Sequence, residues 1–525
     1  MKILFRAKKY LLNDFFILVN NIVGDKMEIF WCNKCSTPVI KQKYISDLGN
    51  LSEKAEENPY IDIEDEIAEW VLKNKKYYLY DVFLNIKEEI KNMISNNKDK
   101  KSIKSFIEKN YSLDKDLLQF IYRYLNFKVN NSNDGHVDKY LCPNCNKEVE
   151  YIGRDIRPVF IEERIMLSVI LDDNYINKNL WKGTGNRYIE DGESLNISKK
   201  ELYNIDNIYE KAEEIRKKIE NNEKVIDFSN FIEVNKKHFK HIDKNAQDFI
   251  EDVSTIFSDR MEVVSFSGGK DSTVVSDLVT RALTTNNILH VFGDTTLEFP
   301  FTYEYVERLK NKNVRPPFLS VDTSDQYFEE LAHKFGPPSR VMRWCCSIFK
   351  TGPIGSLFRD ITEDNNILTY YGVRRSESNS RKDYDKISKS PKISKQLVVS
   401  PIIDWNDVDV WLYLLTRDID FNKAYRVGFN RVGCWCCPNN SKWSEFLSKI
   451  YMSQKAKNWK EFLVSFAKKI GKPDPVEYIE SGNWKARQGG QGLDTNQVIL
   501  DSEPCGLGEH SKHYDLKKPI DDSLY

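Results

Sequence analysis

The chain has 525 residues, of which 40% are hydrophobic and 30% are charged, and its basic and acidic residues nearly cancel to a net charge of −1. A chain of this length is expected to form more than one domain. The balanced charge excludes a strongly basic coat for nucleic acid, but it leaves room for a local basic groove. No apolar run is long enough to cross a membrane, so no membrane partner is expected.

The ten cysteines occur as two Cys-x-x-Cys pairs, one Cys-Cys pair, one Cys-x-Cys-Cys run and one single residue. This clustering is typical of metal binding in a reducing cytoplasm rather than of disulfides in a secreted protein. The apolar segment 11–23 contains polar residues, and no small-residue cleavage site follows it. It therefore predicts an amphipathic helix and not a signal peptide. Met1 and Met27 are both candidates for the start.

Residues 1–160 are predicted to form a zinc ribbon. Each Cys-x-x-Cys pair of this region lies on a turn between short extended stretches, and four such thiolates are a common ligand set for Zn²⁺. Helical patterns between the two turns predict an insertion at about residues 46–138. Its lysine-rich segment 96–104 predicts a solvated loop. The four predicted zinc ligands are Cys32, Cys35, Cys142 and Cys145.

Residues 161–245 predict a connector or small accessory domain, with short strands and turns at 180–198 and an exposed helix at 208–225. From Met261 the pattern alternates between strands and helices, which is typical of a doubly wound parallel α/β sheet. A catalytic domain is expected at 246–425, and a segment that binds an iron–sulfur cluster at 426–525. The strands are predicted at 262–267, 288–294, 317–323, 367–374 and 397–404, and the helices between them at 272–283 and 301–311.

The string SFSGGKDS follows the first of these strands and precedes the first helix. Its two glycines let the backbone approach a ligand closely, and the amide groups of the turn and of the helix N-terminus form an anion site. Lys270 adds a positive charge for a phosphate, while Asp271 is suited to cap the helix or to hold Mg²⁺. The Walker pattern is absent, so an ordinary P-loop NTPase is excluded. The predicted phosphate-binding residues are Ser265, Ser267, Gly268, Gly269, Lys270, Asp271 and Ser272.

This loop resembles the PP-loop of the ATP pyrophosphatase superfamily, which splits ATP into AMP and pyrophosphate. Three further strings, FGDTTLEFPFTYEYV, GVRRSESNSR and SPIIDWNDVDVWLYL, resemble elements of the phosphoadenosine phosphosulfate (PAPS) reductase family. The likeness covers roughly residues 250–445. Thr296 stands where that family usually has glycine, and Phe301 where it usually has glutamate.

The resemblance implies an adenine-nucleotide α-hydrolase-like fold that binds ATP with Mg²⁺. It adds Asp294, Arg374 and Arg381 to the nucleotide site, and it gives Lys270 and Asp271 catalytic roles. Asp294 and Arg374 are expected at the carboxyl ends of strands, where ligands of such sheets bind. Guanidinium groups suit phosphate or sulfate, although each arginine alone would be explained equally well by a surface ion pair.

The remaining cysteines resemble the [4Fe–4S] pattern of assimilatory adenylylsulfate reductases, in which a tandem Cys-Cys pairs with a distant Cys-x-x-Cys. Four thiolates suit such a cluster. A second structural zinc site is the alternative, although zinc turns normally separate their cysteines. Cys436 is a fifth thiol, which is either a spare buried cysteine or a ligand, resolving thiol or sulfur carrier. The predicted cluster ligands are Cys345, Cys346, Cys434 and Cys437.

Near the end of the chain, Cys505 lies in EPCGLGEH, which is similar to the segment that carries the catalytic cysteine of PAPS reductases. Pro504 and Gly508 depart from that segment, so a tail cysteine without a catalytic role is an equal alternative. If the similarity reflects function, Cys505 is the nucleophile, and a nearby histidine lowers its pKa.

Three functions compete. The intact loop favours ATP-dependent adenylation of an acceptor followed by sulfur transfer, and the zinc ribbon favours a nucleic-acid acceptor, as in DNA-phosphorothioation and tRNA-thiolation enzymes. The cysteine pattern and Cys505 favour reduction of adenylyl sulfate or PAPS to sulfite. A zinc-ribbon protein that senses a nucleotide without catalysis ranks last, because Lys270 and Asp271 are both present. A sulfur donor or electron donor protein is a further expected partner.

Overall fold

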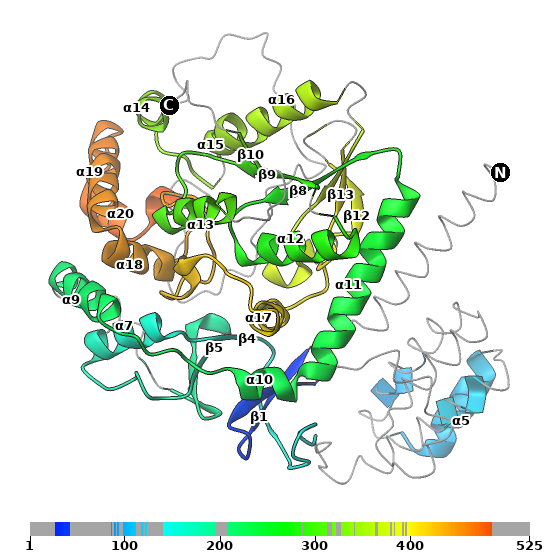
Figure 1. Ribbon diagram of the computed structural model, residues 1–525. Coiled ribbons are helices and arrows are strands. Elements are labelled where there is room, and N and C mark those ends of the chain that lie inside the picture. Colours follow the sequence, from blue (N-terminus) through cyan, green and yellow to red (C-terminus); the bar gives the residue numbers. More distant parts are fainter. Residues whose placement is uncertain are drawn as a thin grey trace. The chain divides into compact units, whose positions relative to one another are not determined.

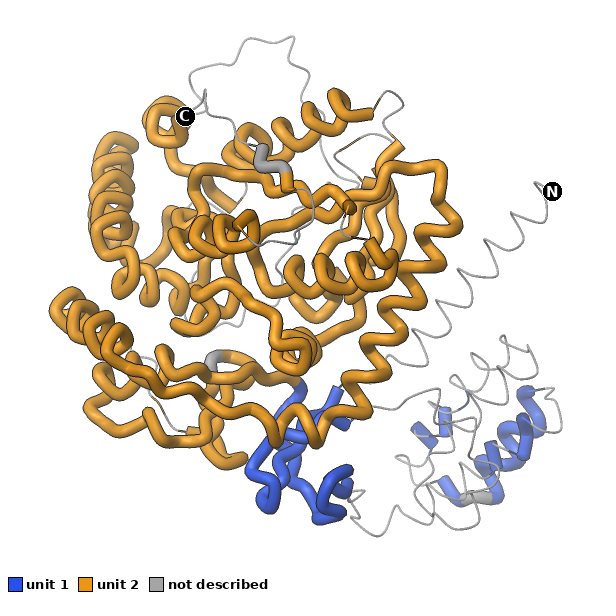
Figure 2. Tube along the Cα trace, in the orientation of Figure 1, with its two compact units in different colours: residues 1–154 blue, residues 155–525 orange. Residues whose placement is uncertain are grey.

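The structure is a computed structural model of the chain. It divides into two units, residues 1–154 and 155–525, which Figure 2 distinguishes by colour. The helix expected at 11–23 and the segment around Cys505 lie outside the described residues. The described residues are 27–41, 98–111, 140–195, 207–285, 287–311, 318–321, 327–340, 342–362, 366–378, 381–382, 384–390 and 396–485, together with isolated residues between 86 and 122 and at 197 and 393.

The first unit contains a three-stranded antiparallel sheet in the order β2-β1-β3. β1 (Glu28–Cys32) and β2 (Thr37–Lys41) form a hairpin whose turn carries the first cysteine pair, and β3 (Glu150–Gly153) follows the second pair. Ile29 and Val39 are fully buried in it. The extended stretches predicted around both Cys-x-x-Cys turns are therefore confirmed.

One expectation for the insertion is wrong. The lysine-rich segment 96–104 was expected to be a loop, but α5 (Lys100–Asn110) begins inside it. The Asp99 carboxylate caps this helix by accepting a hydrogen bond from the Ser102 amide at 2.7 Å. Ile103 and Ile107, four residues apart, share one buried face. Charge composition alone did not indicate this apolar stripe.

The second unit begins with a small antiparallel sheet in the order β4-β5-β6-β7. The short strands expected at 180–198 and the helix expected at 208–225 are confirmed. The last helix of the region crosses residue 245 and runs directly into the large sheet. The elements are β4 (Ile156–Pro158), α7 (Ile161–Leu171), β5 (Leu180–Gly183), β6 (Tyr188–Glu190), β7 (Glu193–Ser194), α9 (Ile208–Glu220), α10 (Ser229–Val234) and α11 (Lys236–Ile256).

A six-stranded sheet in the order β10-β9-β8-β11-β13-β12 organises the rest of the unit. Its first five strands are parallel, and β12 pairs antiparallel with β13 at the edge. This confirms the predicted doubly wound α/β class, while the antiparallel edge strand was not foreseen. The strands are β8 (Met261–Phe266), β9 (Leu289–Gly293), β10 (Phe318–Val321), β11 (Ile367–Tyr370), β12 (Ile387–Lys389) and β13 (Gln396–Val399).

Helices cover both faces of this sheet (Figure 1). Phe266 and Phe292 pack against Tyr305 of α13 on one face. Val263 is three residues before Phe266 on β8, so its side chain points to the other face of the sheet, where it packs against Ile354 of α16. The helices are α12 (Lys270–Ala282), α13 (Pro300–Lys310), α14 (Phe328–Phe335), α15 (Trp344–Cys346) with a π-helical turn (Ser347–Thr351), α16 (Gly352–Ile361), α17 (Asp407–Thr416), α18 (Lys442–Tyr451), α19 (Ser453–Lys469) and α20 (Pro475–Glu480).

The strand order reverses between β8 and β11. The chain builds outward through β9 and β10 on one side of β8, and then continues with β11 on its other side. In open α/β sheets ligands bind outside the carboxyl ends of the strands at such a reversal. The fold therefore directs attention to the segments that follow β8 and β11.

Candidate functional site at the carboxyl edge of the sheet

The predicted phosphate loop lies at this reversal. Ser265 belongs to β8, the residues 267–269 form the turn, and Lys270 begins α12. No side chain caps α12, so the amide groups of its first turn point toward the site without a side-chain acceptor from the N-cap. The Ser267 and Ser272 hydroxyl oxygens lie 3.2 Å apart across the turn. The loop has the first-turn amides and the hydroxyl groups that suit an anion site, although the Lys270 amide donates a hydrogen bond to the Tyr425 hydroxyl at 3.0 Å.

Two glycines give the turn its shape for different reasons. Gly268 has a φ of 69°, and a Cβ there would lie 2.7 Å from Thr302 Cγ2. Gly372, just after β11, brings its backbone against the start of α12. A Cβ on Gly372 would lie 2.6 Å from the carbonyl carbon of Asp271 and 2.7 Å from the amide nitrogen of Ser272. The first residue of GVRRSESNSR is therefore packed directly on the phosphate loop.

Two cations and two carboxylates meet beside the loop. Lys270 Nζ lies 3.1 Å from an Asp271 oxygen and 3.0 Å from an Asp407 oxygen. Arg374 bridges the same carboxylates, at 2.5 Å from Asp271 and 3.0 Å from Asp407. Burial raises the pKa of Asp271, but the positive charges of Arg374 and Lys270 outweigh it and hold that pKa at about 2. Asp271 is therefore charged at neutral pH. The carboxylate oxygens of Asp271 and Asp407 are of the type that Mg²⁺ prefers.

Asp155 supports this cluster from a distant part of the chain. Its carboxylate accepts hydrogen bonds from the Asp407 and Val408 amides, each at 3.0 Å, at the start of α17. Burial, and after it the negative charge of Asp407, raise the pKa of Asp155 to about 7. The N-terminus of α17 and the Asp407 carboxylate are therefore held in place by the first residue of the second unit.

The other predicted nucleotide residues line the same edge. Asp294, after β9, accepts hydrogen bonds at 2.8 Å from the Thr296 amide and from the Tyr303 hydroxyl. Arg381 forms an ion pair with Glu377. Burial, and after it the positive charge of Arg431, lower the pKa of Arg381. Arg431 adds a cation that the sequence had not marked, because it lies outside the recognised strings.

The predicted cluster cysteines come from two segments that the fold brings together. Cys345 and Cys434 border one apolar cluster with Cys436, and Cys437 is close enough to Cys346 for their charges to interact. Cys436 differs from the others, because it is 4% exposed and packs among Leu297, Phe328, Ala332 and Phe349. Its position favours the interpretation of a buried packing cysteine over that of a ligand.

One short segment connects the two halves of the site. Leu297 accepts a hydrogen bond from the Trp435 amide at 2.8 Å, and Glu298 forms a β-bridge with Cys434. Glu298 is 6% exposed and accepts a hydrogen bond from Thr295, whose hydroxyl lies 3.4 Å from Cys434 Sγ. The segment that starts at Asp294 beside the nucleotide loop thus ends against the cysteines.

A buried ionic network fixes the chain that leads into Cys434. Arg157 forms a two-pronged ion pair with Glu163, and Lys182 Nζ lies 3.2 Å from the same carboxylate. Arg157 also donates to the Gly428 carbonyl at 3.1 Å and to Asn430 at 2.7 Å. All three ionic side chains are at most 4% exposed. The residues expected to form a separate connector therefore anchor the cysteine segment of the large domain.

The N-terminal cysteines form a separate group within the first unit. Among the described residues, theirs are the only Cys, His, Asp or Glu ligand atoms that gather as three or more within 4.8 Å of one another. Cys32 and Cys145 sulfurs lie 3.4 Å apart, and those of Cys35 and Cys142 lie 3.9 Å apart. Four thiolates around one tetrahedral ion with metal–sulfur bonds of about 2.3 Å are roughly 3.8 Å apart. The donor set and spacing fit one metal ion.

Sequence patterns located the loop with Lys270 and Asp271, the glycines and Arg374, but they did not assign Asp407 or Asp155 to the site. Asp407 lies inside SPIIDWNDVDVWLYL, but the string did not distinguish it from the other aspartates that it contains. Asp155 had no signal, because its role depends on a contact across 252 residues.

The fold and this edge together define an α/β protein with an anion site at the reversal point of a doubly wound sheet. None of the described helices combines the length and apolar composition that crossing a bilayer requires.

Comparison with known proteins gives the family. The model of the phosphoadenosine phosphosulfate reductase domain matches residues 262–440. An adenosine 5'-phosphosulfate reductase of Oceanobacillus iheyensis is 31% identical over 179 residues, which cover 33% of this chain and 70% of that protein. The chain therefore belongs to the phosphoadenosine phosphosulfate reductase family.

Other relatives share less of their length. An uncharacterized protein of Methanocaldococcus jannaschii is 30% identical over 258 residues, 49% of this chain and 52% of that protein. The chain spans about half the length of this relative and of a second one from the same organism, at 49%. A phosphoadenylyl-sulfate reductase structure from Candida auris aligns over 38% of this chain and 96% of that chain, with 18% identity and a TM-score of 0.30.

Proposed function

We propose that the chain is an ATP pyrophosphatase that adenylates an acceptor and couples this step to sulfur transfer. The observation that carries the proposal is the complete loop, in which Gly268 holds the turn open and Lys270 and Asp271 are both present and charged. A substrate that is already adenylated needs no site for a leaving pyrophosphate, whereas ATP does.

The chemistry follows from the position of the charges. An acceptor oxygen attacks the α-phosphorus, a new oxygen–phosphorus bond forms, and the bond to the leaving pyrophosphate breaks. Lys270 and the amide groups of the loop would stabilise the negative charge that grows on the leaving group. Asp271 and Asp407 would hold Mg²⁺ against the phosphates, with Arg374 balancing the charge. Sulfide then attacks the activated carbon, the bond from that carbon to oxygen breaks, and AMP leaves.

The proposed cofactors follow from the cysteines. Cys345, Cys346, Cys434 and Cys437 would hold a [4Fe–4S] cluster, which supplies a centre for electron transfer or sulfur binding. The N-terminal four would hold Zn²⁺. Cys505 remains a proposed nucleophile by its sequence context alone.

Reduction of adenylyl sulfate or PAPS to sulfite is the second candidate. It is favoured by relatives that are named adenosine 5'-phosphosulfate reductase and are 27–31% identical. The arginines Arg381 and Arg431 beside the loop suit a sulfate group equally well. The thiols would then deliver electrons rather than sulfur.

Pyrophosphate release from labelled ATP separates the two candidates. The anaerobically purified chain is incubated with MgATP and either RNA, single-stranded DNA or buffer, and in parallel with adenylyl sulfate plus reduced thioredoxin. We expect pyrophosphate in the first set, and Lys270→Met should abolish it. Sulfite from adenylyl sulfate with no pyrophosphate under any condition would replace the first proposal by the second.

A further inference from the structure

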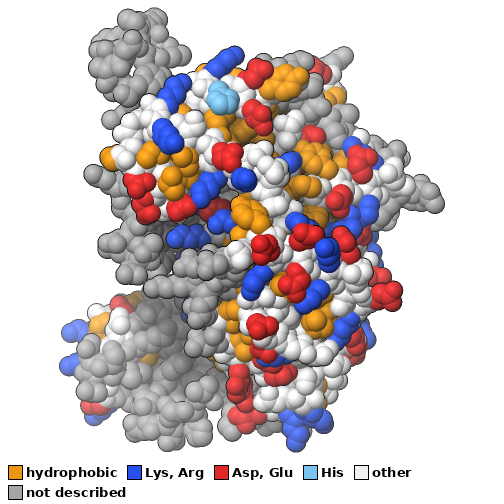
Figure 3. Space-filling view, turned by 90° about the vertical axis from the view of Figure 1, so that its left-hand side faces the viewer, with side chains coloured by type: hydrophobic (Ala, Val, Ile, Leu, Met, Phe, Trp, Pro, Cys, Tyr) orange, Lys and Arg blue, Asp and Glu red, His pale blue; other side chains and the backbone are white. Residues whose placement is uncertain are grey.

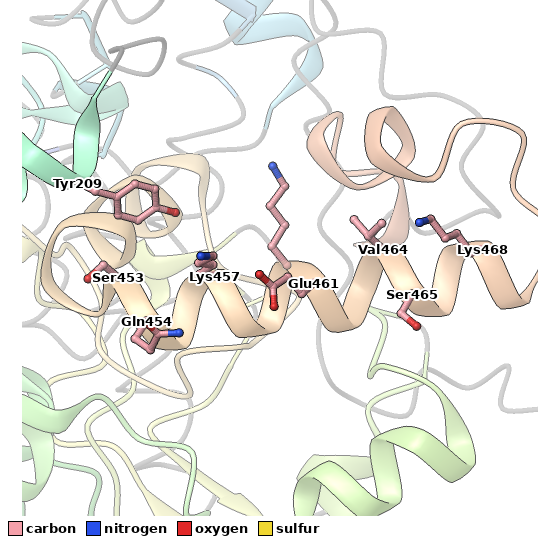
Figure 4. Close-up of a pocket in the computed structure, with 9 residues that line it drawn as sticks. Tyr209, Ser453, Gln454, Lys457, Glu461, Val464, Ser465 and Lys468 are labelled. Carbon is pink, nitrogen blue, oxygen red and sulfur yellow. The ribbon is translucent and has the colours of Figure 1, made fainter.

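A groove of about 780 Å³ runs along one side of α19, in the second unit. Figure 3 views the side of the molecule on which α9 and α19 lie in Figure 1, and basic and acidic side chains both occur on it. Lysine dominates the charged lining of the groove: Lys457, Lys460 and Lys468 against Glu461. In Figure 4, Lys457 and Lys468 lie along α19, and Tyr209 of α9 lies beside the N-terminal end of the helix.

Two of these lysines have no charge partner in the part of the chain that the structure describes. Among the described residues, no carboxylate lies within ion-pairing distance of Lys457 or Lys468, and both side chains are exposed. Lys460 pairs with Glu480 on the rim, where both groups are about half exposed. The eleven residues from Lys457 to Lys468 correspond to about 16 Å along the helix axis. Lys457 and Lys468 therefore give the groove two positive charges that no described carboxylate pairs with, although Glu461 also lines it.

Neighbouring lysines on α9 provide a contrast. Lys217 pairs with Glu213 at 2.8 Å, and Lys218 pairs with Glu214 at 2.7 Å. These lysines are part of a helix face with balanced charge, which is the usual arrangement on a solvated surface. The lysines Lys217 and Lys218 of α9 thus have acidic partners that Lys457 and Lys468 lack among the described residues.

The opposite side of α19 packs toward the cysteine segment. The rings of Trp459 and Trp435 contact each other at 5.9 Å between centroids, and Trp435 lies between Cys434 and Cys436 in the chain. Phe462 belongs to the same apolar cluster. One helix therefore carries the basic groove on its outer side and supports the proposed sulfur site on its inner side.

We propose that this groove binds the phosphodiester backbone of single-stranded nucleic acid, with the Tyr209 ring stacking on a base. Lysines attract the phosphates, and an exposed aromatic ring offers a stacking surface that accepts any base. Tyr209 is 48% exposed. A membrane surface fits less well, because the apolar side of α19 is already packed inward and is not free to enter a bilayer. This inference rests on the proposed function, since it names the class of acceptor.

Binding is measured by fluorescence anisotropy with the full chain and labelled 20-nucleotide single strands, one RNA and one DNA, between 50 and 200 mM salt. Each phosphate contact in a single strand adds about 0.7 to the slope of log affinity against log salt. The double variant Lys457→Gln/Lys468→Gln should lose two contacts, so the magnitude of its slope should be smaller by roughly 1.4. At 0.1 M salt this corresponds to binding that is weaker by about 25-fold. A preference for one strand type identifies the natural acceptor.

The matched control is Lys217→Gln/Lys218→Gln, which removes the same charge outside the groove and should leave affinity and slope unchanged. Tyr209→Leu should weaken binding by about fivefold or more, and Tyr209→Phe should not. The inference is overturned if neither oligonucleotide binds at 50 mM salt, if the control variant loses as much affinity as the groove variant, or if only vesicles containing phosphatidylserine bind.

The outcome is separable from that of the proposed function. Pyrophosphate release without oligonucleotide binding would overturn the groove assignment and leave the ATP chemistry standing. Oligonucleotide binding without pyrophosphate release would do the reverse.

Discussion

Replacing Gly372 by alanine tests whether the segment after β11 and the phosphate loop form one unit. The added Cβ would lie 2.6 and 2.7 Å from backbone atoms of Asp271 and Ser272. Backbone atoms cannot rotate away as a flexible side chain can, so the first turn of α12 has to shift. Overpacking of this kind costs about 1–3 kcal/mol.

If that cost falls on the conformation that binds nucleotide, the dissociation constant for MgATP should rise roughly 5- to 150-fold. Isothermal titration with a non-hydrolysable ATP analogue measures the change, and circular dichroism checks that the variant is folded. Gly355→Ala is the control, because its Cβ would meet only Arg359 Nη1, at 3.8 Å. Nucleotide binding and thermal stability equal to the wild type in Gly372→Ala would refute the close packing on which the site depends.

Four further changes test the surroundings. Thr296 has a φ of 61°, so Thr296→Gly should raise the free energy of unfolding by about 0.5–1 kcal/mol, and a lower urea midpoint would contradict this. The raised pKa of Asp155 means that, between about pH 4 and pH 7, the folded protein keeps a proton on this carboxyl that the unfolded chain has lost. The contribution of Asp155 to the free energy of unfolding should therefore decline as the pH rises through this range. Asp155→Asn should flatten this part of the stability profile, and an unchanged profile would show that another group titrates. Glu163→Gln leaves Arg157 and Lys182 buried without their anion and should cost about 3–5 kcal/mol in urea unfolding, whereas a loss below 1 kcal/mol would contradict the network. Cys436→Ala should retain about four irons per chain in anaerobic preparations and Cys437→Ala should lose them, and the reverse result would exchange the roles of the two thiols.

The large sheet could be predicted because its signals are local. Each strand is a short apolar run bounded by a turn, and the loop SFSGGKDS marks the first strand end. The strand order places Gly372 against that loop, and the resemblance had already singled out the string that Gly372 begins. Local signals also explain the error at α5, where lysine content outweighed the spacing of two isoleucines.

The part of Asp155 in the site could not be predicted, because its signal is not local. Asp155 is an ordinary aspartate in a region without a motif, and only the fold brings it to the start of α17. Arg157 and Glu163 likewise acquire their roles through contacts with a segment about 270 residues away. Pairings of this kind depend on how β4 packs against α17 and the segment 428–430, which residue patterns along the chain do not encode.

The connection between the two chemistries is short. Asp294 beside the nucleotide loop and Glu298 beside Cys434 are four residues apart, and four residues span at most about 14 Å even when fully extended. Thr296, between them, is in the left-handed region, so the real distance is shorter than that limit. The backbone that separates the nucleotide side of this segment from its thiol side is therefore shorter than about 14 Å. Under the proposed function, an activated acceptor would have a short distance to travel to the thiols. Under the proposed function, this short distance needs no carrier domain to move the activated intermediate. The left-handed residue Thr296 lies in segment 294–298, whose geometry helps to set the distance between the nucleotide loop and the thiols.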